Sequence, residues 1–494
     1  MANDVAHAEA DASLEPVQEN CRGSNTATAP MAATTWWASL NSPTLIAAPM
    51  VLQSELAFRQ MMRQHGAQLC YTPMITADML LRDLDRVEEQ ALARRPPSAQ
   101  KQRRRKHPQK SGEVEDDEEE DQQHPLAASQ RLKHDATGGA QADGGGPTPS
   151  ASSTCCSALR SWQVWKQRQR AVAFQRNSFD GGIVADDRPL FAQVAANTPE
   201  VFVRAALELQ AAGGIDAVDL NLGCPQSRAE RDNFGAFLLR DDLPLVCRMI
   251  TAATQHPDLR LPVTVKIRRC SGPPSDTVAV VKALVAAGAQ LVAIHGRPIT
   301  MKNHQGAADH SHAAAARREL VNQQRQQQQR QQQQQHRQDQ HESTTTTNTM
   351  PPSVRPTVPI IANGNIWSMV EAQTVLRETM CDGVMCASAL LANPRLFSTE
   401  TDHGDGGGGG GGGVGGGGGH TSDGSDVMAT AIARCREYLA MARVHVPFHP
   451  KSIKDHLLTF LRRAVAPTWK RAPNSGTDAW ADVWTVLGLS LIHI

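Results

Sequence analysis

Residues 217–226 read AVDLNLGCPQ, an apolar run that ends at a glycine, a cysteine and a proline. Short apolar runs bounded by glycine and proline are typical of strands that are buried on both faces. Proline lacks the backbone N–H that a sheet requires, so the strand has to end before Pro225. The thiol of Cys224 is therefore expected at the carboxyl end of a buried strand.

Runs of the same kind recur along the chain and alternate with segments of helical periodicity. The other runs cover residues 45–50, 68–74, 189–196, 262–268, 291–296, 358–364 and 383–389. Three intervening segments, residues 54–66, 199–214 and 276–288, end in glycine, as helix C-termini often do. Near-continuous apolar strands separated by helices indicate a parallel sheet that is covered on both faces. Units of this kind in a row predict an α/β fold, a (β/α)8 TIM barrel.

Several tracts of low complexity interrupt or flank this pattern. About residues 94–161 hold a Lys/Arg cluster, an acidic block and Gly/Ser/Pro-rich sequence, and about 310–355 are mostly Gln, Arg, His and Thr. Such compositions cannot bury enough apolar surface to offset chain entropy, so we expect these insertions to be disordered. The predicted organisation is a disordered segment at 1–40, a TIM barrel at 41–398, a Gly-rich linker at 399–426, a helical domain at 427–475 and an unassigned tail at 476–494.

The region after the barrel shows apolar residues at helical spacing, which predicts a small helical domain. Its second helix carries the basic residues Lys451, Lys454, Arg462 and Arg463. These charges form either a solvated face or a contact surface for nucleic acid. Residues 489–494, LSLIHI, are what a common sequencing-library adapter would encode, so we expect this end to be artefactual and the natural C-terminus to be missing.

Composition excludes several classes of protein. The 494 residues include 50 basic and 50 acidic ones, so the overall charge gives no sign of nucleic-acid binding. The ten cysteines form no CxxC pairs or His/Cys ladders, which predicts neither a disulfide framework nor a zinc site and favours a reducing compartment. We find no signal peptide or membrane-spanning run and expect a soluble cytoplasmic protein. The cluster KQRRRK at 101–106 is either a nuclear localisation signal or part of a solvated spacer.

Polar residues concentrate at the carboxyl ends of the predicted strands, which form the active-site face of a TIM barrel. They are Asn221, Cys224, Lys266, Arg268, His295, Arg297, Asn363 and Asn365. A cysteine at a strand end is more often a small buried hydrophobe than a reactive group, and His295 is equally compatible with a core histidine. An unpaired ammonium in an apolar strand is costly, so Lys266 favours a site. The short turns after the last two strands favour a phosphorylated cofactor.

A series of motifs follows in a specific order along the chain. They are YTPMI (71–75), DLNLGCPQ (219–226), FGAFLLRD (234–241), VKIR (265–268), IHGR (294–297), ANGNI (362–366) and DGVMCASALLANPRLF (382–397). Together they resemble the tRNA-dihydrouridine synthases, and the CPQ, YTPMI and FGAFL variants are most similar to the eukaryotic tRNA-dihydrouridine(16/17) synthase branch. The resemblance implies a barrel that binds FMN and a helical domain that grips tRNA through its basic helix.

The resemblance also assigns roles by motif position. It implies that Cys224 is the catalytic acid and that Asn221, Lys266 and Arg268 face the target uracil. The residues that would hold FMN are Ala48, Pro49, Met50, Gln193, Lys266, His295, Asn363, Gly364, Asn365, Gly383, Ala387 and Ser388. Reduced flavin would deliver hydride to C6 of a D-loop uridine, Cys224 would protonate C5, and NADPH or NADH would regenerate the flavin. A thiol with a pKa of about 8.5 is mostly protonated at neutral pH and can act as this acid.

The sequence departs from the family pattern in three places. The loop after the cysteine reads RDNFG rather than RGxYG, Pro298 replaces the usual threonine, and the last strand ends in CASAL instead of an acidic residue and a glycine. The CASAL change motivates one alternative, a noncatalytic tRNA-binding relative that has lost flavin. The other alternative is an FMN barrel that reduces a small molecule and does not need the basic helix. We expect a monomer with tRNA as its partner.

Overall fold

The computed structural model describes residues 33–93, 186–301, 306–341, 357–398 and 424–469, with a few separate positions between 169 and 184. The insertion expected at about 94–161, most of the segment 1–40, nearly all of the Gly-rich linker and the tail at 476–494 lie outside these residues. Within the described part, no helix is both long enough and apolar enough to cross a membrane.

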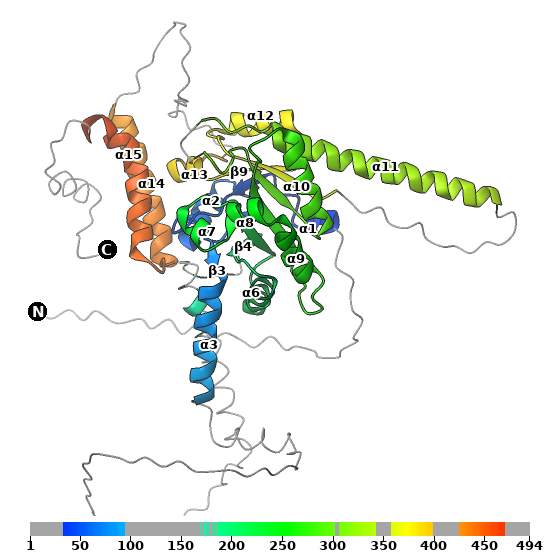
Figure 1. Cartoon of the computed structure of the whole chain (residues 1–494). Helices are drawn as coiled ribbons and strands as arrows, with labels where there is room; N and C mark the ends of the chain where they lie inside the picture. Colours follow the sequence, from blue (N-terminus) through cyan, green and yellow to red (C-terminus); the bar gives the residue numbers. More distant parts are fainter. Residues whose placement is uncertain are drawn as a thin grey trace, which may run out of the picture.

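Parallel strands form a barrel that is flanked by helices (Figure 1). The strands are β1 (Leu45–Ala47), β2 (Cys70–Tyr71), β3 (Ile75–Thr76), β4 (Leu190–Ala195), β5 (Ala217–Leu222), β6 (Val263–Arg268), β7 (Val292–His295), β8 (Ile360–Asn363) and β9 (Gly383–Cys386). Neighbours follow the order β1-β9-β8-β7-β6-β5-β4-β2, and a bridge between Ile46 and Leu69 brings β1 to β2. Each predicted run contains one of these strands, which confirms the TIM barrel. The short strand β3, which pairs with β4, lies outside the predicted runs and was not predicted as a strand of its own.

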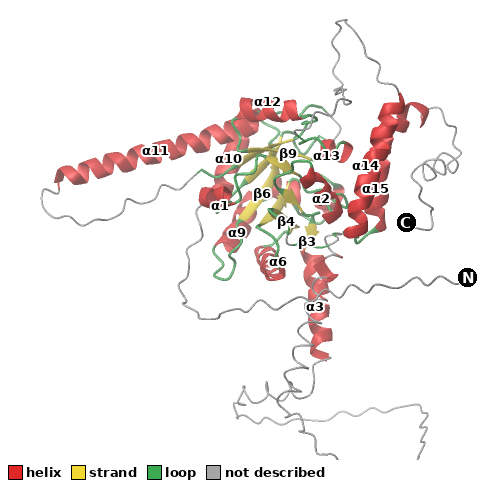
Figure 2. Cartoon of the chain, turned by 180° about the vertical axis from the view of Figure 1, so that it is seen from behind, coloured by secondary structure: helices red, strands yellow, loops and turns green. Residues whose placement is uncertain are grey.

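Helices connect the strands and flank the sheet (Figure 2). They are α1 (Ala33–Ser39), α2 (Leu56–Gln64), α3 (Ala77–Ala93), α6 (Pro199–Ala212), α7 (Ser227–Arg231), α8 (Gly235–Asp241), α9 (Leu243–Thr254), α10 (Pro274–Ala286), α11 (Ser311–His341), α12 (Met369–Thr379) and α13 (Ser388–Ala392). Gly66, Gly213 and Gly288 follow α2, α6 and α10 with φ angles of 95°, 77° and 115°. A left-handed backbone at a helix end suits glycine, so the glycines mark these ends as predicted.

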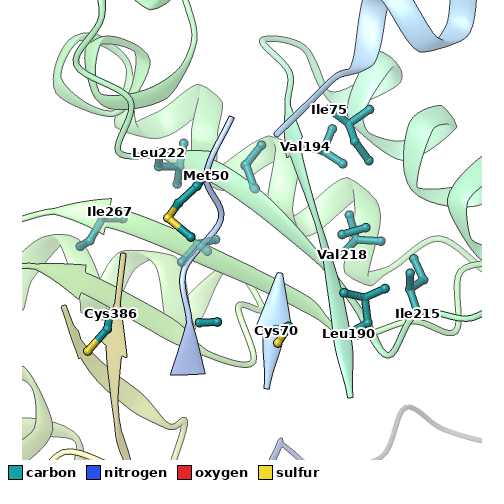
Figure 3. Close-up of a cluster of buried hydrophobic side chains, with 14 of the residues drawn as sticks. Met50, Cys70, Ile75, Leu190, Val194, Ile215, Val218, Leu222, Ile267 and Cys386 are labelled. Atoms are coloured by element: carbon teal, nitrogen blue, oxygen red, sulfur yellow. The ribbon is translucent and has the colours of Figure 1, made fainter. Parts of the chain in front are cut away.

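The hydrophobic core fills the barrel and the space between the sheet and its helices. Met50, after β1, and Cys386, at the end of β9, belong to the part of it shown in Figure 3. A second cluster contains Trp36 and Trp37 of α1, and the ring of Trp36 stacks on that of Phe191 with centroids 5.5 Å apart. Its members lie mostly where the strands begin. Helix α1 therefore closes that end of the barrel, which leaves the carboxyl ends for a site.

Helix α11 corrects the expectation of disorder in the tract at about 310–355. Residues Ser311–His341 form one helix between β7 and β8, and its first turns pack against α10 with Ala313, Ala316 and Leu320 buried. The helix then continues as a largely exposed arm (Figure 1). Glutamine and arginine have high helix propensity, so a Gln-rich segment can extend a helix that packing has nucleated. The rest of the tract lies outside the described residues.

Two long helices, α14 (Gly424–Val444) and α15 (Pro450–Trp469), occupy the region expected to be helical and lie beside α2 (Figures 1 and 2). The carboxylate of Glu55, directly before α2, is fully buried at this contact. It accepts a hydrogen bond from the Tyr438 hydroxyl at 2.7 Å, and its other oxygen lies 3.1 Å from His456 Nε2. The helical pair is thus attached to the barrel next to the loop between β1 and α2.

Candidate active site

A cavity of about 340 Å³ opens at the carboxyl ends of the strands. Its lining brings together most of the predicted residues, namely Ala48, Pro49, Met50, Gln193, Asn221, Cys224, Lys266, Arg268, His295, Asn363, Gly364, Asn365, Ala387 and Ser388. Gly383 does not line the cavity, because it begins β9 at the other end of the barrel, against Ile361 and Pro43. The basic residues of α15 are also outside this lining.

Hydrogen bonds to Asn221 hold the loop that carries Cys224. Asn221 Oδ1 accepts the backbone N–H groups of Gly223 at 3.1 Å and of Cys224 at 3.0 Å. Gly235 lies against this loop with φ at 68°, and a Cβ atom there would approach Cys224 Cβ to 3.0 Å. The RDNFG sequence therefore keeps the one glycine that close approach requires. Burial raises the pKa of the half-buried Cys224 thiol, outweighing nearby positive charges, so the thiol is protonated at neutral pH.

The Lys266 ammonium is a hydrogen-bond donor in the cavity lining. Lys266 is half-buried in the cavity lining, and among the described residues its ammonium has no hydrogen-bond or ion-pair partner. Burial lowers the pKa of Lys266 to about 8, assisted by the charge of Arg268 and opposed by that of Asp219. An ammonium in such a place is costly without an acceptor. The geometry fits a ligand that presents acceptor atoms or negative charge.

Two arginines, Arg268 and Arg297, donate hydrogen bonds to the loops at the edge of the cavity. Arg268 donates from Nε to the carbonyl of Gly223 at 3.0 Å, and from a terminal nitrogen to carbonyls of the loop after β7. Burial lowers the pKa of Arg268 to about 10, so it remains charged at neutral pH. Arg297 donates to the carbonyl of Gly306 at 2.8 Å and to the side-chain oxygen of Asn365. Both guanidinium groups therefore hold backbone or turn positions in addition to lining the cavity.

His295 is a neutral imidazole with its proton on Nε2. Burial lowers its pKa to about 2, together with the positive charges of Lys266, Arg268 and Arg297. Its Nδ1 atom accepts the backbone N–H of Arg297 at 3.1 Å. A neutral imidazole carries one proton, so Nε2 is left as a hydrogen-bond donor. The cavity thus contains a second donor suited to an acceptor atom.

The turns after β8 and β9 meet at one side of the cavity. Asn363 Nδ2 donates to the carbonyl of Met385 at 2.6 Å and so joins the two turns. Gly364 has φ at 111°, and a Cβ atom there would lie 3.0 Å from His295 Cε1. The CASAL sequence does not strain the second turn, since Ala387 has φ at −124° and no residue of this turn has a positive φ. The alanines of CASAL therefore replace no obligatory glycine and do not argue for a lost cofactor.

The cavity lining also includes several residues for which the sequence predicted no role. Met74 Sδ lies 3.2 Å from Asn221 Nδ2, Gln53 belongs to the loop after β1, and the 46% exposed side chain of Trp367 follows the ANGNI turn. Arg297 had been noted only as a polar residue at a strand end. Position at the end of a predicted run was the available signal for Met74 and Arg297. The sequence carried no comparable signal for Gln53 or Trp367.

The basic residues of α15 lie on a separate surface. Lys451, Lys454 and Arg462 are exposed, and Lys451 pairs with Asp455 one turn further along. His456 of the same helix is buried at the contact with Glu55. The exposed charges thus accompany a helix whose other side packs on the protein. Arg463 lies in α15, but its side chain is outside the described part.

The chain matches a family model and several named proteins. The family model described as dihydrouridine synthase matches residues 45–102 and 160–406. A mouse protein named "tRNA-dihydrouridine(16/17) synthase [NAD(P)(+)]-like" is 29% identical over 366 residues, which are 73% of this chain and 49% of the mouse protein. The Schizosaccharomyces pombe tRNA-dihydrouridine(16/17) synthase is 30% identical over 225 residues, 45% of this chain and 46% of its own. The chain spans about half the length of the curated relatives it matches. The match to a solved structure of morphinone reductase in complex with tetrahydroNAD covers 72% of this chain and 85% of that chain, at 11% identity and a TM-score of 0.30.

Proposed function

The chain belongs to the dihydrouridine synthase family, and from this premise we propose that it reduces uridine to 5,6-dihydrouridine in the D-loop of tRNA. FMN would be the cofactor, and NADPH or NADH the reductant. The names of the relatives specify tRNA and NAD(P)(+), and the cavity at the barrel end contains a thiol that can donate a proton and an ammonium that suits a negatively charged ligand. We further propose that the protein acts as a monomer in the cytoplasm or the nucleus.

The donors of the cavity fit FMN. The Lys266 ammonium and His295 Nε2 are available for acceptor atoms of a flavin ring, and the turns after β8 and β9 offer backbone N–H groups to a phosphate. The residues proposed to hold FMN are Ala48, Pro49, Met50, Gln193, Lys266, His295, Asn363, Gly364, Asn365, Ala387 and Ser388. When bound and reduced, FMN supplies the hydride for C6 of the uracil.

Cys224 is proposed to deliver the proton to C5 of the uracil. Burial keeps its thiol protonated at neutral pH, which is the state that an acid requires. Asn221, Lys266 and Arg268 line the same cavity and are proposed to contact the uracil edge. Most donors of Arg268 already serve backbone carbonyls, so this arginine supports the rim as well as the substrate.

The substrate has to reach a cavity at the end of a barrel. A base inside the folded tRNA elbow cannot do so while it is stacked, so we propose that the target uridine is turned out of its stack. Lys454 and Arg462 are exposed on α15 and suit contacts with tRNA phosphates. Lys451 and Arg463 complete this proposed RNA surface.

One observation carries the proposal, namely that the Lys266 ammonium, which has no partner in the described part of the chain, lies in the same cavity as the protonated Cys224 thiol. The test begins with the absorption spectrum of the purified protein and assays dihydrouridine formation in tRNA with NADPH. Cys224→Ala is expected to lose activity by about 10²- to 10⁴-fold, typical of removing a general acid, and to retain FMN. Cys247→Ala is the matched control, since Cys247 is half-buried on α9 outside the cavity.

Each outcome of this test has a distinct meaning. A folded protein that binds no FMN when offered an excess of it, yet still binds tRNA, would favour the noncatalytic relative. Turnover of a small enone without tRNA, unaffected by removal of α14 and α15, would favour the small-molecule reductase. Wild-type activity in Cys224→Ala would remove the proton-donor role and leave the rest of the proposal in place.

A further inference from the structure

Asp219 is a buried carboxylate that the proposed chemistry does not use. It lies in β5, its side chain has no solvent exposure, and it is absent from the cavity lining. Its oxygens accept hydrogen bonds from Gln193 Nε2 at 2.9 Å and Thr264 Oγ1 at 2.7 Å. A carboxylate that is buried among neutral donors costs stability. Its place beneath the cavity therefore calls for a functional explanation.

A line of side-chain amides connects Asp219 to the backbone of Cys224. Gln193 of β4 stands beside Asp219 in the sheet register and donates to it through Nε2. Its Oε1 atom accepts from Asn221 Nδ2 at 2.8 Å. Asn221 Oδ1 in turn accepts the N–H groups of Gly223 and Cys224. These contacts link a buried carboxylate to the loop that bears the proposed proton donor.

The two ends of this line allow each amide only one orientation. A carboxylate accepts hydrogen bonds, whereas a backbone N–H only donates them. Gln193 must therefore donate toward Asp219, and Asn221 must donate toward Gln193. Turning either amide would place two donors or two acceptors face to face. A buried network that is satisfied in only one way is rigid.

We propose that Asp219 is a positioning residue, which orients the amides of Gln193 and Asn221 and through them holds the Cys224 loop. Asp219 accepts at one end of the line and the N–H groups of Gly223 and Cys224 donate at the other, so both ends require the same direction. The inference rests on the proposed function only for what Cys224 does with its proton. The orientation itself is a property of the protein without FMN or tRNA, so it can be tested separately.

The test transfers the carboxyl group from position 219 to position 193, the next side chain in the hydrogen-bonded line. Gln193→Glu sets a second carboxyl group against Asp219, and such a pair shares one proton at a pH below its raised pKa. The variant is therefore measured at a pH high enough to ionise both groups, where their repulsion is expected to break the line. Adding Asp219→Asn removes the clash, because the new amide donates to the new carboxylate while its oxygen still accepts from Thr264. Asp219→Asn alone is the control. Its oxygen can still accept from Gln193, since the Thr264 hydroxyl can accept as well as donate. All these substitutions are close to isosteric.

The readouts use flavin-free protein and need neither tRNA nor turnover. They are hydrogen exchange in the peptide that contains Gly223 and Cys224, and the alkylation rate of Cys224 with Cys247 as an internal reference. Loss of one buried hydrogen bond predicts that Gln193→Glu accelerates both by about tenfold. The double variant and Asp219→Asn are expected to stay within about threefold of wild type, less than one hydrogen bond's effect.

Two results would overturn the inference. Gln193→Glu would have to leave exchange and alkylation unchanged, or its defect would have to persist in full after Asp219→Asn is added. Failure of the proposed function would look different. A protein that binds no FMN or reduces no tRNA would still show the same pattern of exchange and alkylation, because these depend on the apoprotein alone.

Discussion

Two buried carboxylates, Asp219 beneath the cavity and Glu55 at the contact with the helical pair, have pKa shifts of opposite sign. Both side chains are fully inaccessible to solvent. Burial raises the pKa of Asp219 to about 6, although hydrogen bonds from Gln193 and Thr264 and the charge of Lys266 act in the other direction. Burial would also raise the pKa of Glu55, but the charge interaction with His456 and the hydrogen bonds from that ring and Tyr438 lower it below the ordinary value.

The difference shows how partners decide what a buried charge does. The neutral donors that orient Asp219 and the charge of Lys266 do not fully replace its hydration, so its ionised form opposes folding. An imidazole and a phenol hydroxyl stabilise ionised Glu55, so that carboxylate favours the folded contact. We infer that Asp219 serves the geometry of the cavity, whereas Glu55 serves the attachment of α14 and α15.

Breaking the Glu55 contact is expected to have the largest effect on stability. Glu55→Ala leaves the buried Tyr438 hydroxyl and His456 Nε2 without their acceptor. At about 1–3 kcal/mol for each unsatisfied group, the free energy of unfolding should fall by about 2–6 kcal/mol. Urea denaturation measures this loss, and tRNA affinity should fall with it because α15 is no longer held in place.

Glu437→Ala is the matched control for this prediction. Glu437 joins α14 to the same part of the barrel, lying against His65 and 3.2 Å from Arg395, but it is partly exposed. Partly exposed pairs contribute less than buried ones, so its loss should cost about 1 kcal/mol. A cost for Glu55→Ala no greater than that for Glu437→Ala would contradict the special role of Glu55.

The pH dependence of stability tests the comparison, because the pKa shifts of the two carboxylates have opposite signs. The pKa of Asp219 in the fold is about 6 against an ordinary 3.8, so the folded state binds its proton more tightly and loses stability as pH rises from about 4 to 6. Roughly two units correspond to at most about 3 kcal/mol. The difference in unfolding free energy between Asp219→Asn and wild type should therefore increase across this range.

Glu55→Gln provides the opposite sign in the same experiment. The folded pKa of Glu55 lies below its ordinary value of 4.5, so its contribution is present above that value and is lost as pH falls through the folded pKa. The free energy of unfolding of Glu55→Gln should therefore fall relative to that of wild type as pH rises toward 4.5, and the difference should be fully present above that value. Urea denaturation at a series of pH values measures the free energy of unfolding of both variants and of wild type. If the difference from wild type changed with pH in the same direction for both variants, the contrast would be refuted.

The smallest expected effect concerns the exposed face of α15. Lys454→Ala removes one proposed phosphate contact, so the slope of log affinity for tRNA against log salt should become shallower by about 0.7–0.9. Filter binding or fluorescence anisotropy over a salt series measures this slope. Lys282→Ala on α10, where Lys282 pairs with Glu319, is the control and should leave the slope unchanged. An equal change in both variants would show that α15 is not the RNA surface.

The barrel could be predicted because its strands are short, apolar and bounded by glycine or proline. β5 (Ala217–Leu222) and β8 (Ile360–Asn363) lie within their predicted runs. Two details escaped this reasoning. β3 is only the pair Ile75–Thr76, which is too short for a periodic signal. The whole of α11 was taken for disordered insertion, because composition describes a Gln-rich tract but not the packing of its first turns on α10.

The members of the candidate site could be named from sequence because strand ends meet at one face of a barrel. Their roles in binding and catalysis stay predictions. Gly383 lies outside the cavity lining, and a motif that spans a whole strand does not show which of its ends faces the cavity. Gln53 and Trp367 were missed because they lie in loops, where no period indicates direction.

The sequence by itself determined the order of strands and helices, the family and the thiol at the end of β5, because these depend on neighbouring residues and their spacing. Only the tertiary structure decided which groups satisfy one another. Asp219 and Gln193 are 26 residues apart, and Glu55 and His456 are 401 apart. A buried charge must find its partners wherever the fold brings them, so the sign of its pKa shift is a property of the assembled protein and not of any segment.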